Sequence, residues 1–247
     1  MSKLILWSQD KNQFILTSFI TIMFMVGCEK QIQPDVMVHG ELKKIMHGDA
    51  REGIVNLGDV LKNEHIFGLG AMENLDGEII IMDSEILITR AEVDQNPKIQ
   101  MDVTENDKAL LLVTSRVQSW TETVIGEQAV SGTIDKIIKT HADEMRLDTN
   151  KPFPFIIEGE FELMNWHIIS SPEPGGSHDD HLEQSWKRRD VNVHGKILGF
   201  YSEHHKAIFT HHTTFTHMHV LYEDENLSGH IDELVINKNW SLKVPTN

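Results

Sequence analysis

The stretch THMHVLYEDENLSGH (216–230) contains three histidines whose spacing could build a metal site. Alternate side chains of a β-strand face the same side, so His217 and His219 would be neighbours and Met218 would point the opposite way. The polar segment EDENLSG predicts a turn, and a returning strand would bring His230 beside the pair. Three neutral imidazoles with one coordination position left open are typical of a catalytic zinc site, and they also suit other divalent metals.

Two other interpretations compete with a three-histidine site. The chain has 15 histidines, so an H-x-H spacing can arise by chance. Two adjacent pairs precede the stretch, at His204, His205, His211 and His212. In addition, Glu223 shares strand parity with His217 and His219, which makes an H-x-H-x3-E pattern resembling the first motif of the cupins, another metal-binding β architecture. A chance cluster, a cupin-like site and a three-histidine site therefore all remain open from spacing alone.

The composition favours small-molecule chemistry over nucleic-acid binding. With 247 residues, 40% hydrophobic and 24% charged, the chain has the composition of an ordinary globular protein. Only 22 lysines and arginines stand against 38 acids, for a net charge of −16. Because phosphate binding needs clustered cations, we expect no nucleic-acid partner. Cys28 is the single cysteine, which excludes an intramolecular disulfide and a thiolate metal site.

The beginning of the chain resembles a bacterial lipoprotein signal. The apolar run Phe14–Val26 has the length of a signal-peptide core and is too short to span a bilayer comfortably. It ends at Gly27-Cys28, which resembles a lipobox with Met25 at the usual leucine position. An N-terminal core helix or a permanent anchor is the alternative.

The lipobox resemblance implies cleavage before Cys28 and lipid attachment to its thiol. Residues 1–27 would then be a signal peptide and residues 28–37 a tether. We therefore expect an exported lipoprotein of a bacterial cell envelope, which touches the membrane only through the lipid at Cys28.

The remaining patterns predict an α+β protein dominated by antiparallel sheet. Asp76-Gly77 and Asp83-Ser84 break the apolar segment 65–89 into a β-meander, and Glu158-Gly159 is expected to separate two strands within 152–169. Further strands are expected within 108–117, 191–202, 215–223 and 229–237, and helices within 38–62 and 131–145.

Several motifs resemble the alpha-acetolactate decarboxylase family. FGLGAMENLDGEIIIMDSEI (67–86) is similar to the family's signature hairpin, G-I-G-T-F-N-x-L-D-G-E followed by an apolar strand and an acidic turn. IIEGEFE and NVHGKILGFYS resemble two further family blocks in the same order. THMHVLYED followed by SGHIDE resembles the H-L-H-F and G-G-H-V-x-D elements. The similarity runs from about residue 64 to 234, and cupins have no counterpart of the hairpin.

The resemblance implies a fold of two packed, mixed or antiparallel β-sheets with a few helices. We place an N-terminal α/β subdomain at 38–165 and a C-terminal antiparallel subdomain with the metal site at 166–247. The resemblance also implies that His217, His219 and His230 bind Zn²⁺ or another divalent metal, and that Glu78 is the active-site carboxylate. A solvated acid beside a turn is the alternative for Glu78.

The implied reaction is metal-dependent decarboxylation of 2-acetolactate to acetoin and CO₂, without an organic cofactor. The substrate would be a small 2-hydroxy-3-oxo acid. The sequence does not distinguish a monomer from a homodimer.

Three positions depart from the family pattern. Ala71 stands where the hairpin usually has threonine, and His167 stands where the family has an arginine, a planar and permanently charged partner for carboxylates. The family's carboxylate near its C-terminus has no evident counterpart; Glu233 and a final strand follow His230. Two interpretations fit: a decarboxylase in which His167 replaces the arginine, or a divergent metal-binding relative without this activity, such as a lipid-anchored ligand- or metal-binding module.

Overall fold

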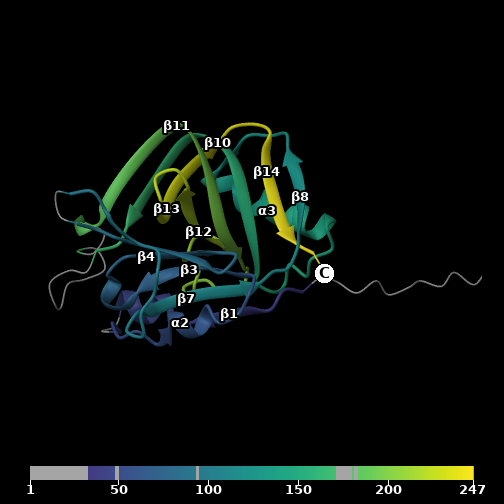
Figure 1. Cartoon of the computed structure of the whole chain (residues 1–247). Helices are drawn as coiled ribbons and strands as arrows, with labels where there is room; N and C mark the ends of the chain where they lie inside the picture. Colours follow the sequence, from purple (N-terminus) through teal and green to yellow (C-terminus); the bar gives the residue numbers. More distant parts are fainter. Residues whose placement is uncertain (1–32, 48–49, 93–94, 171–179, 181–182, 247) are drawn as a thin grey trace, which may run out of the picture. The chain divides into compact units, whose positions relative to one another are not determined.

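Runs of isoleucine, valine and leucine form the strands of two antiparallel sheets, which confirms the expected α+β class with few helices (Figure 1). The computed structural model describes residues 33–47, 50–92, 95–170, 180 and 183–246. The predicted signal peptide and the lipidation site Cys28 lie outside the described residues. Among the described residues, no helix is both long and apolar enough to cross a membrane.

The first sheet comes from the earlier part of the chain. Its strand order is β1 (Val36–His39), β7 (Lys108–Arg116), β3 (Ile66–Met72), β4 (Glu78–Met82), β5 (Glu85–Arg90) and β6 (Lys98–Gln100), and β2 (Val55–Asn56) also pairs with β7. The helix α2 (Leu57–Val60) contributes Leu57 to the cluster on one face, and α1 (Leu42–His47) contributes Ile45 to the cluster on the other. Covered faces on both sides explain why the β4 sequence is a continuous apolar run rather than an alternation.

The predicted β-meander is present in this sheet. The 3-10 turn η1 (Glu73–Leu75) and Gly77 connect β3 to β4, and the Met72 N–H donates to the Gly77 carbonyl at 3.0 Å. Gly77 has φ +112°, a backbone conformation that favours glycine. Asp83 and Ser84, both with positive φ, form the two-residue turn from β4 to β5. The hairpin therefore holds Glu78 at the first position of β4.

The second sheet closes on itself through an additional pairing between two of its strands. Its order is β8 (Trp120–Ile125), β14 (Trp240–Pro245), β10 (Phe153–Ile168), β11 (Trp186–Tyr201), β12 (Thr216–Tyr222), β13 (Leu227–Ile236) and β9 (Ala129–Val130). Because β10 also pairs with β13, the strands β10, β11, β12 and β13 form a closed circuit. The helix α3 (Ser131–Glu144) packs Ile134, Ile137 and Ile138 into the core of this sheet.

The turn predicted at Glu158-Gly159 is wrong, because β10 is one strand of 16 residues. Gly159 pairs with Gly195 in the middle of the β10–β11 ladder. A Cβ atom on Gly159 would lie 2.9 Å from the Trp240 Cβ, so a missing side chain is needed here for packing rather than for a turn. At this point the other edge of β10 changes its partner from β14 to β13.

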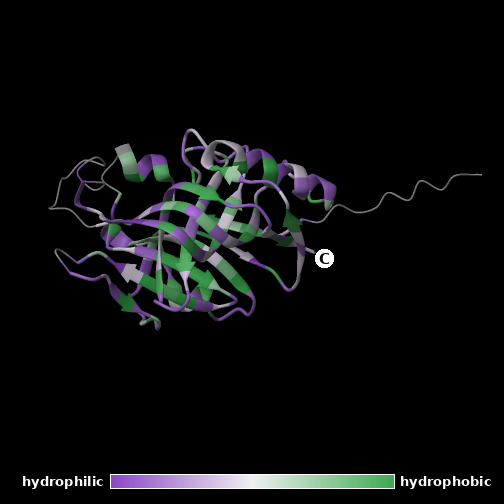
Figure 2. Ribbon diagram, turned by 90° about the horizontal axis from the view of Figure 1, so that it is seen from above, coloured by the Kyte–Doolittle hydropathy of each residue, from purple (hydrophilic) through white to green (hydrophobic). Residues whose placement is uncertain are grey.

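The chain passes from the first sheet to the second between β7 and β8. The boundary expected at 165/166 falls within β10, and the described residues from 33 onward belong to one compact unit. The two sheets share a core in which Leu69 and Ile80 pack with Leu198 and Phe200. Hydrophobic segments concentrate in the strands and hydrophilic ones in the connections, as seen from above in Figure 2. This shared core brings β4 of the first sheet against β13 of the second.

Candidate active site

The strand β12 separates its side chains by parity, as the sequence predicts. Met218 and Val220 join the core that includes α3. His217 and His219 point the other way, in the same direction as Leu221, which joins the core between the sheets. The two imidazoles therefore become neighbours, with ring centroids 5.1 Å apart.

The strand β13 brings the third histidine to the pair. His230 lies directly opposite His219 in the β12–β13 ladder and directly opposite His167 in the β10–β13 ladder. The turn occupies residues 223–226, so Gly229 lies in the strand and does not break it. A Cβ atom on Gly229 would lie 2.5 Å from the His167 carbonyl oxygen. Glycine at this position lets β13 approach β10 closely just before His230.

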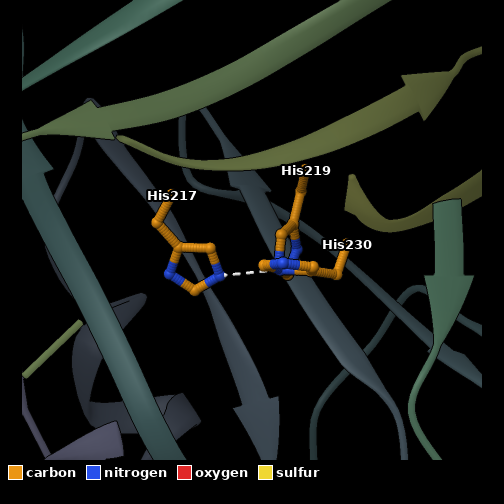
Figure 3. Close-up of side chains that lie close together, drawn as sticks. All are labelled: His217, His219 and His230. Atoms are coloured by element: carbon orange, nitrogen blue, oxygen red, sulfur yellow. Dashed lines mark hydrogen bonds between the residues drawn. The ribbon is translucent and has the colours of Figure 1, made fainter. Parts of the chain in front are cut away.

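His217, His219 and His230 converge on one point between the sheets (Figure 3). One ring nitrogen from each lies within 4.8 Å of the others. The His217 Nε2 and His230 Nδ1 atoms are 3.1 Å apart. Three ring nitrogens at this spacing could hold one metal ion, and among the described residues no other group of three or more histidine, cysteine or acidic side chains has this spacing.

The chemistry of this trio fits a divalent metal. Burial lowers the pKa of His217 to about 4 and those of His219 and His230 well below the usual value, so all three rings are neutral. Neutral imidazole is the form that binds metal. Backbone groups of Phe209 and Ile79 lie close enough to His217 and His219 to act on their pKa values in the raising direction. Neither nitrogen of His219 has a hydrogen bond of standard geometry among the described residues. Since buried polar atoms are normally satisfied, the His219 nitrogen that faces the other two rings fits a cation.

Glu78 is buried beside the trio and is not the solvated turn residue that its sequence position also allowed. The carboxyl is 4% exposed, and its Oε1 atom accepts a 3.2 Å hydrogen bond from the Ile169 N–H. Its Oε2 atom lies 3.5 Å from the His219 Nε2 atom, in a contact that is no ion pair because His219 is neutral. Burial raises the pKa of Glu78 to about 7, although His167 and the Ile169 N–H act in the opposite direction.

His167 is a fourth histidine and lies beside the trio of His217, His219 and His230. Its ring centroid lies 5.1 Å from that of His230. Its Nδ1 atom lies 2.9 Å from both Asp232 carboxylate oxygens. Burial alone would lower the pKa of His167, but the hydrogen bond and charge of Asp232 outweigh burial and raise it above the usual value.

A cavity of about 170 Å³ connects these groups. Glu78, His167, His217 and His230 line it, whereas His219 is fully buried and is not among the lining residues. The rest of the wall is mostly apolar and consists of Leu42, Ile45, Met46, Gly70, Ala71, Leu75, Leu111, Ile169 and Phe209, with His211 and Asp232 as its other polar residues. The site is thus a small, largely apolar pocket with a few convergent polar groups, as is typical of binding sites for small molecules.

The cupin-like interpretation does not fit this geometry. Glu223 belongs to the turn after β12, its side chain is 64% exposed, and it pairs with Lys196 at 2.7 Å. Glu233, the acid that follows His230, is also exposed and accepts a hydrogen bond from Asn165 at 2.7 Å. Neither carboxylate lines the cavity.

The alpha-acetolactate decarboxylase family model matches residues 36–246. The chain belongs to the alpha-acetolactate decarboxylase family. A search of curated proteins found no match. Two crystal structures of acetolactate decarboxylase from Bacillus subtilis share the fold, with 19% and 18% identity, TM-scores of 0.68 and 0.66, and 86% of each chain covered. A Staphylococcus aureus protein of unknown function, described as similar to alpha-acetolactate decarboxylase, has 17% identity and a TM-score of 0.64, with 85% of this chain and 84% of that chain covered.

Two positions at which the sequence was expected to depart from the family motif lie in the cavity wall. Ala71 contributes a methyl group, and the His167 ring is held there by Asp232. The three histidines and Glu78 surround the same region.

Sequence analysis did not identify Asp232 or the apolar cover of the cavity. Asp232 follows His230 by two residues, but it lies at a register shift of the β10–β13 ladder, where strand alternation is interrupted, so no local pattern identifies it. The cover is formed by α1 and the loop before β12. Their contact depends on backbone hydrogen bonds from Leu42 and Lys43 to Ile208 and Ala207, at 2.7 and 2.9 Å, which no local sequence pattern predicts.

Proposed function

We propose that this protein is a metal-dependent decarboxylase of 2-acetolactate that releases acetoin and CO₂. The observation that carries this proposal is the convergence of Glu78, His167, His217 and His230 on one cavity in a member of this family. The volume of the cavity suits a small organic acid.

His217, His219 and His230 would hold the cation. When bound, a Zn²⁺ or similar ion would supply Lewis-acid stabilisation for the negative charge that develops as CO₂ leaves. No organic electron sink is then required.

The chain's own residues have three tasks in this reaction. His167 would contact the oxygen atoms of the substrate. The apolar wall, including Met46 and Phe209, would exclude water and strengthen the electrostatic contacts inside. Glu78 would deliver a proton, because its carboxyl is buried and lines the cavity.

The step balances without an oxidant or reductant. The bond between C2 and the carboxylate carbon breaks, its electron pair spreads from C2 onto the adjacent ketone, and CO₂ departs. The Glu78 proton then forms the new C–H bond at C2 and gives acetoin. Glu78 regains its proton from water before the next cycle.

The test is acetoin release from racemic acetolactate by the purified, zinc-loaded full chain. The Glu78→Gln variant should lower kcat by about 100-fold or more, because a positioned proton donor typically contributes 10²–10⁴-fold. Glu223→Gln, which removes an exposed glutamate outside the cavity, should leave kcat unchanged. Absence of acetoin from the zinc-loaded chain between pH 5 and 8 would refute the proposal.

The replaced arginine and threonine positions favour one alternative, a divergent relative that binds metal and acts on another substrate. In that case the protein would bind zinc through the same three histidines but release no acetoin. Metal content and acetoin release, measured on the same sample, separate the two functions.

A further inference from the structure

The carboxylate of Asp232 is aimed at His167 by an irregularity in the β10–β13 ladder. Asn165 pairs with Glu233 and the next residue, Trp166, pairs with Ile231, so Asp232 is skipped. Two residues on β13 therefore face one step on β10, which is a β-bulge. Bulges re-aim side chains and are common next to active sites.

The bulge gives neighbouring acids different surroundings. Glu233 stays in register, points to the surface and pairs with Asn165. Asp232 has a side chain that is 46% exposed, but it also lines the cavity and has both carboxylate oxygens 2.9 Å from the His167 Nδ1 atom. No other hydrogen bond between described residues engages the His167 ring, so Nε2 is the nitrogen left for a ligand.

Holding His167 matters because the described residues that line the pocket include no arginine. A guanidinium presents its donors in a rigid fork, whereas an imidazole has two nitrogens and two neutral tautomers. A carboxylate on Nδ1 fixes both the ring orientation and the tautomer, which assigns the ligand contact to Nε2.

We propose that Asp232 is a positioning residue that holds the His167 imidazole through Nδ1 and presents Nε2 to the substrate in the cavity. This inference rests on the proposed function for the identity of the substrate. The Asp232–His167 pair replaces, by two residues on adjacent strands, the single arginine of the family motif. Asp232 itself acts only through His167.

The first experiment detects the pair without turnover. In ¹⁵N-labelled full-length protein, the His167 Nδ1–H should give a slowly exchanging, downfield proton signal, assigned by its loss in His167→Gln. Asp232→Asn should remove that signal, and Glu233→Gln, the adjacent control, should retain it. A signal that persists unchanged in Asp232→Asn overturns the inference.

The second experiment measures acetolactate kinetics. Asp232→Asn should lower kcat/KM by about 10-fold or more, the effect typical of losing the partner that orients a functional histidine, while Glu233→Gln stays within about twofold. Asp232→Glu should recover part of the loss. In a His167→Ala background, Asp232→Asn should cause no additional loss, and a further loss of full size there would contradict action through His167.

The two proposals can fail separately. If the wild-type chain shows the Nδ1–H signal but releases no acetoin, only the decarboxylase proposal is refuted. If wild type and Asp232→Asn release acetoin with the same kcat/KM, only the positioning role of Asp232 is refuted.

Discussion

His167 and His230 lie directly opposite each other on β10 and β13, with ring centroids 5.1 Å apart. His230 also pairs with His219 on its other side, so one ladder step across three strands carries three histidines. The metal trio and the proposed substrate-contacting residue thus depend on the same register. A change in that register would affect metal binding and substrate contact together.

Gly229→Ala should test this dependence on register. An added Cβ would lie 2.4 Å from a ring atom of Trp166 and 2.5 Å from the His167 carbonyl oxygen, so β13 must shift. We expect a loss of about 1–3 kcal/mol in the free energy of unfolding, as for other overpacked sites, and a weaker affinity for zinc. Denaturant unfolding and zinc titration measure both. Gly126→Ala, where a Cβ meets no atom within 4 Å, is the matched control. Equal zinc affinity in wild type and Gly229→Ala would show that the site does not need this close approach.

Asp107 should make folding stability depend on pH. Burial would raise its pKa, but hydrogen bonds from Thr104 and Gln100 and the charge of Arg90 outweigh burial and hold the pKa below its ordinary value. A depressed folded-state pKa contributes stability above the unfolded-state pKa, and this stability is lost as pH falls through the folded-state value.

Asp107→Asn should therefore lower the free energy of unfolding at pH 7 by about 1–2 kcal/mol, and the difference from wild type should shrink below about pH 4. Urea unfolding at several pH values provides the measurement. The exposed Asp59, which pairs with Lys62, serves as the control, and Asp59→Asn should change stability by about 0.5 kcal/mol or less. A constant difference between Asp107→Asn and wild type at all pH values would exclude this source of acid sensitivity.

The histidine trio could be predicted because its geometry is local. Strand alternation pairs His217 with His219, and one short turn returns His230 to them. Glu78 and His167 reach the same cavity from strands far away in the sequence, so only the family resemblance connected them to the trio. Their placement depends on the packing of one sheet on the other, which has no sequence period.

The errors in the fold also have physical causes. Glu158-Gly159 has the composition of a turn, but Gly159 is needed to accommodate Trp240 within a long strand. The closure of β10 on β13 and the bulge at Asp232 are long-range pairing features. Strand patterns predict which residues form strands and do not predict which strands are neighbours.

Cys28 should carry the lipid anchor that the N-terminal sequence predicts. Expressed in a bacterium with lipoprotein processing, the wild-type chain should incorporate labelled palmitate and sediment with the membrane fraction. Cys28→Ser should abolish the label, because the thiol is the predicted attachment atom. Ser18→Ala, a change within the same apolar run, should leave labelling intact. Equal labelling of Cys28→Ser and wild type would exclude the lipobox interpretation.

Zinc should stabilise the folded chain through the three histidines. A ligand that binds only the folded state stabilises it by about 2.7 kcal/mol at 100 times its Kd, so zinc should raise Tm by several degrees and a chelator should reverse the rise. The His217→Ala, His219→Ala double variant should lose this response and its bound metal, because His230 alone cannot form the site. The chain's 15 histidines make a control for weak surface binding necessary. The double variant His194→Ala, His212→Ala removes two exposed imidazoles and should retain about one equivalent of zinc and the full Tm shift. The same Tm shift in both double variants would mean that zinc binds elsewhere.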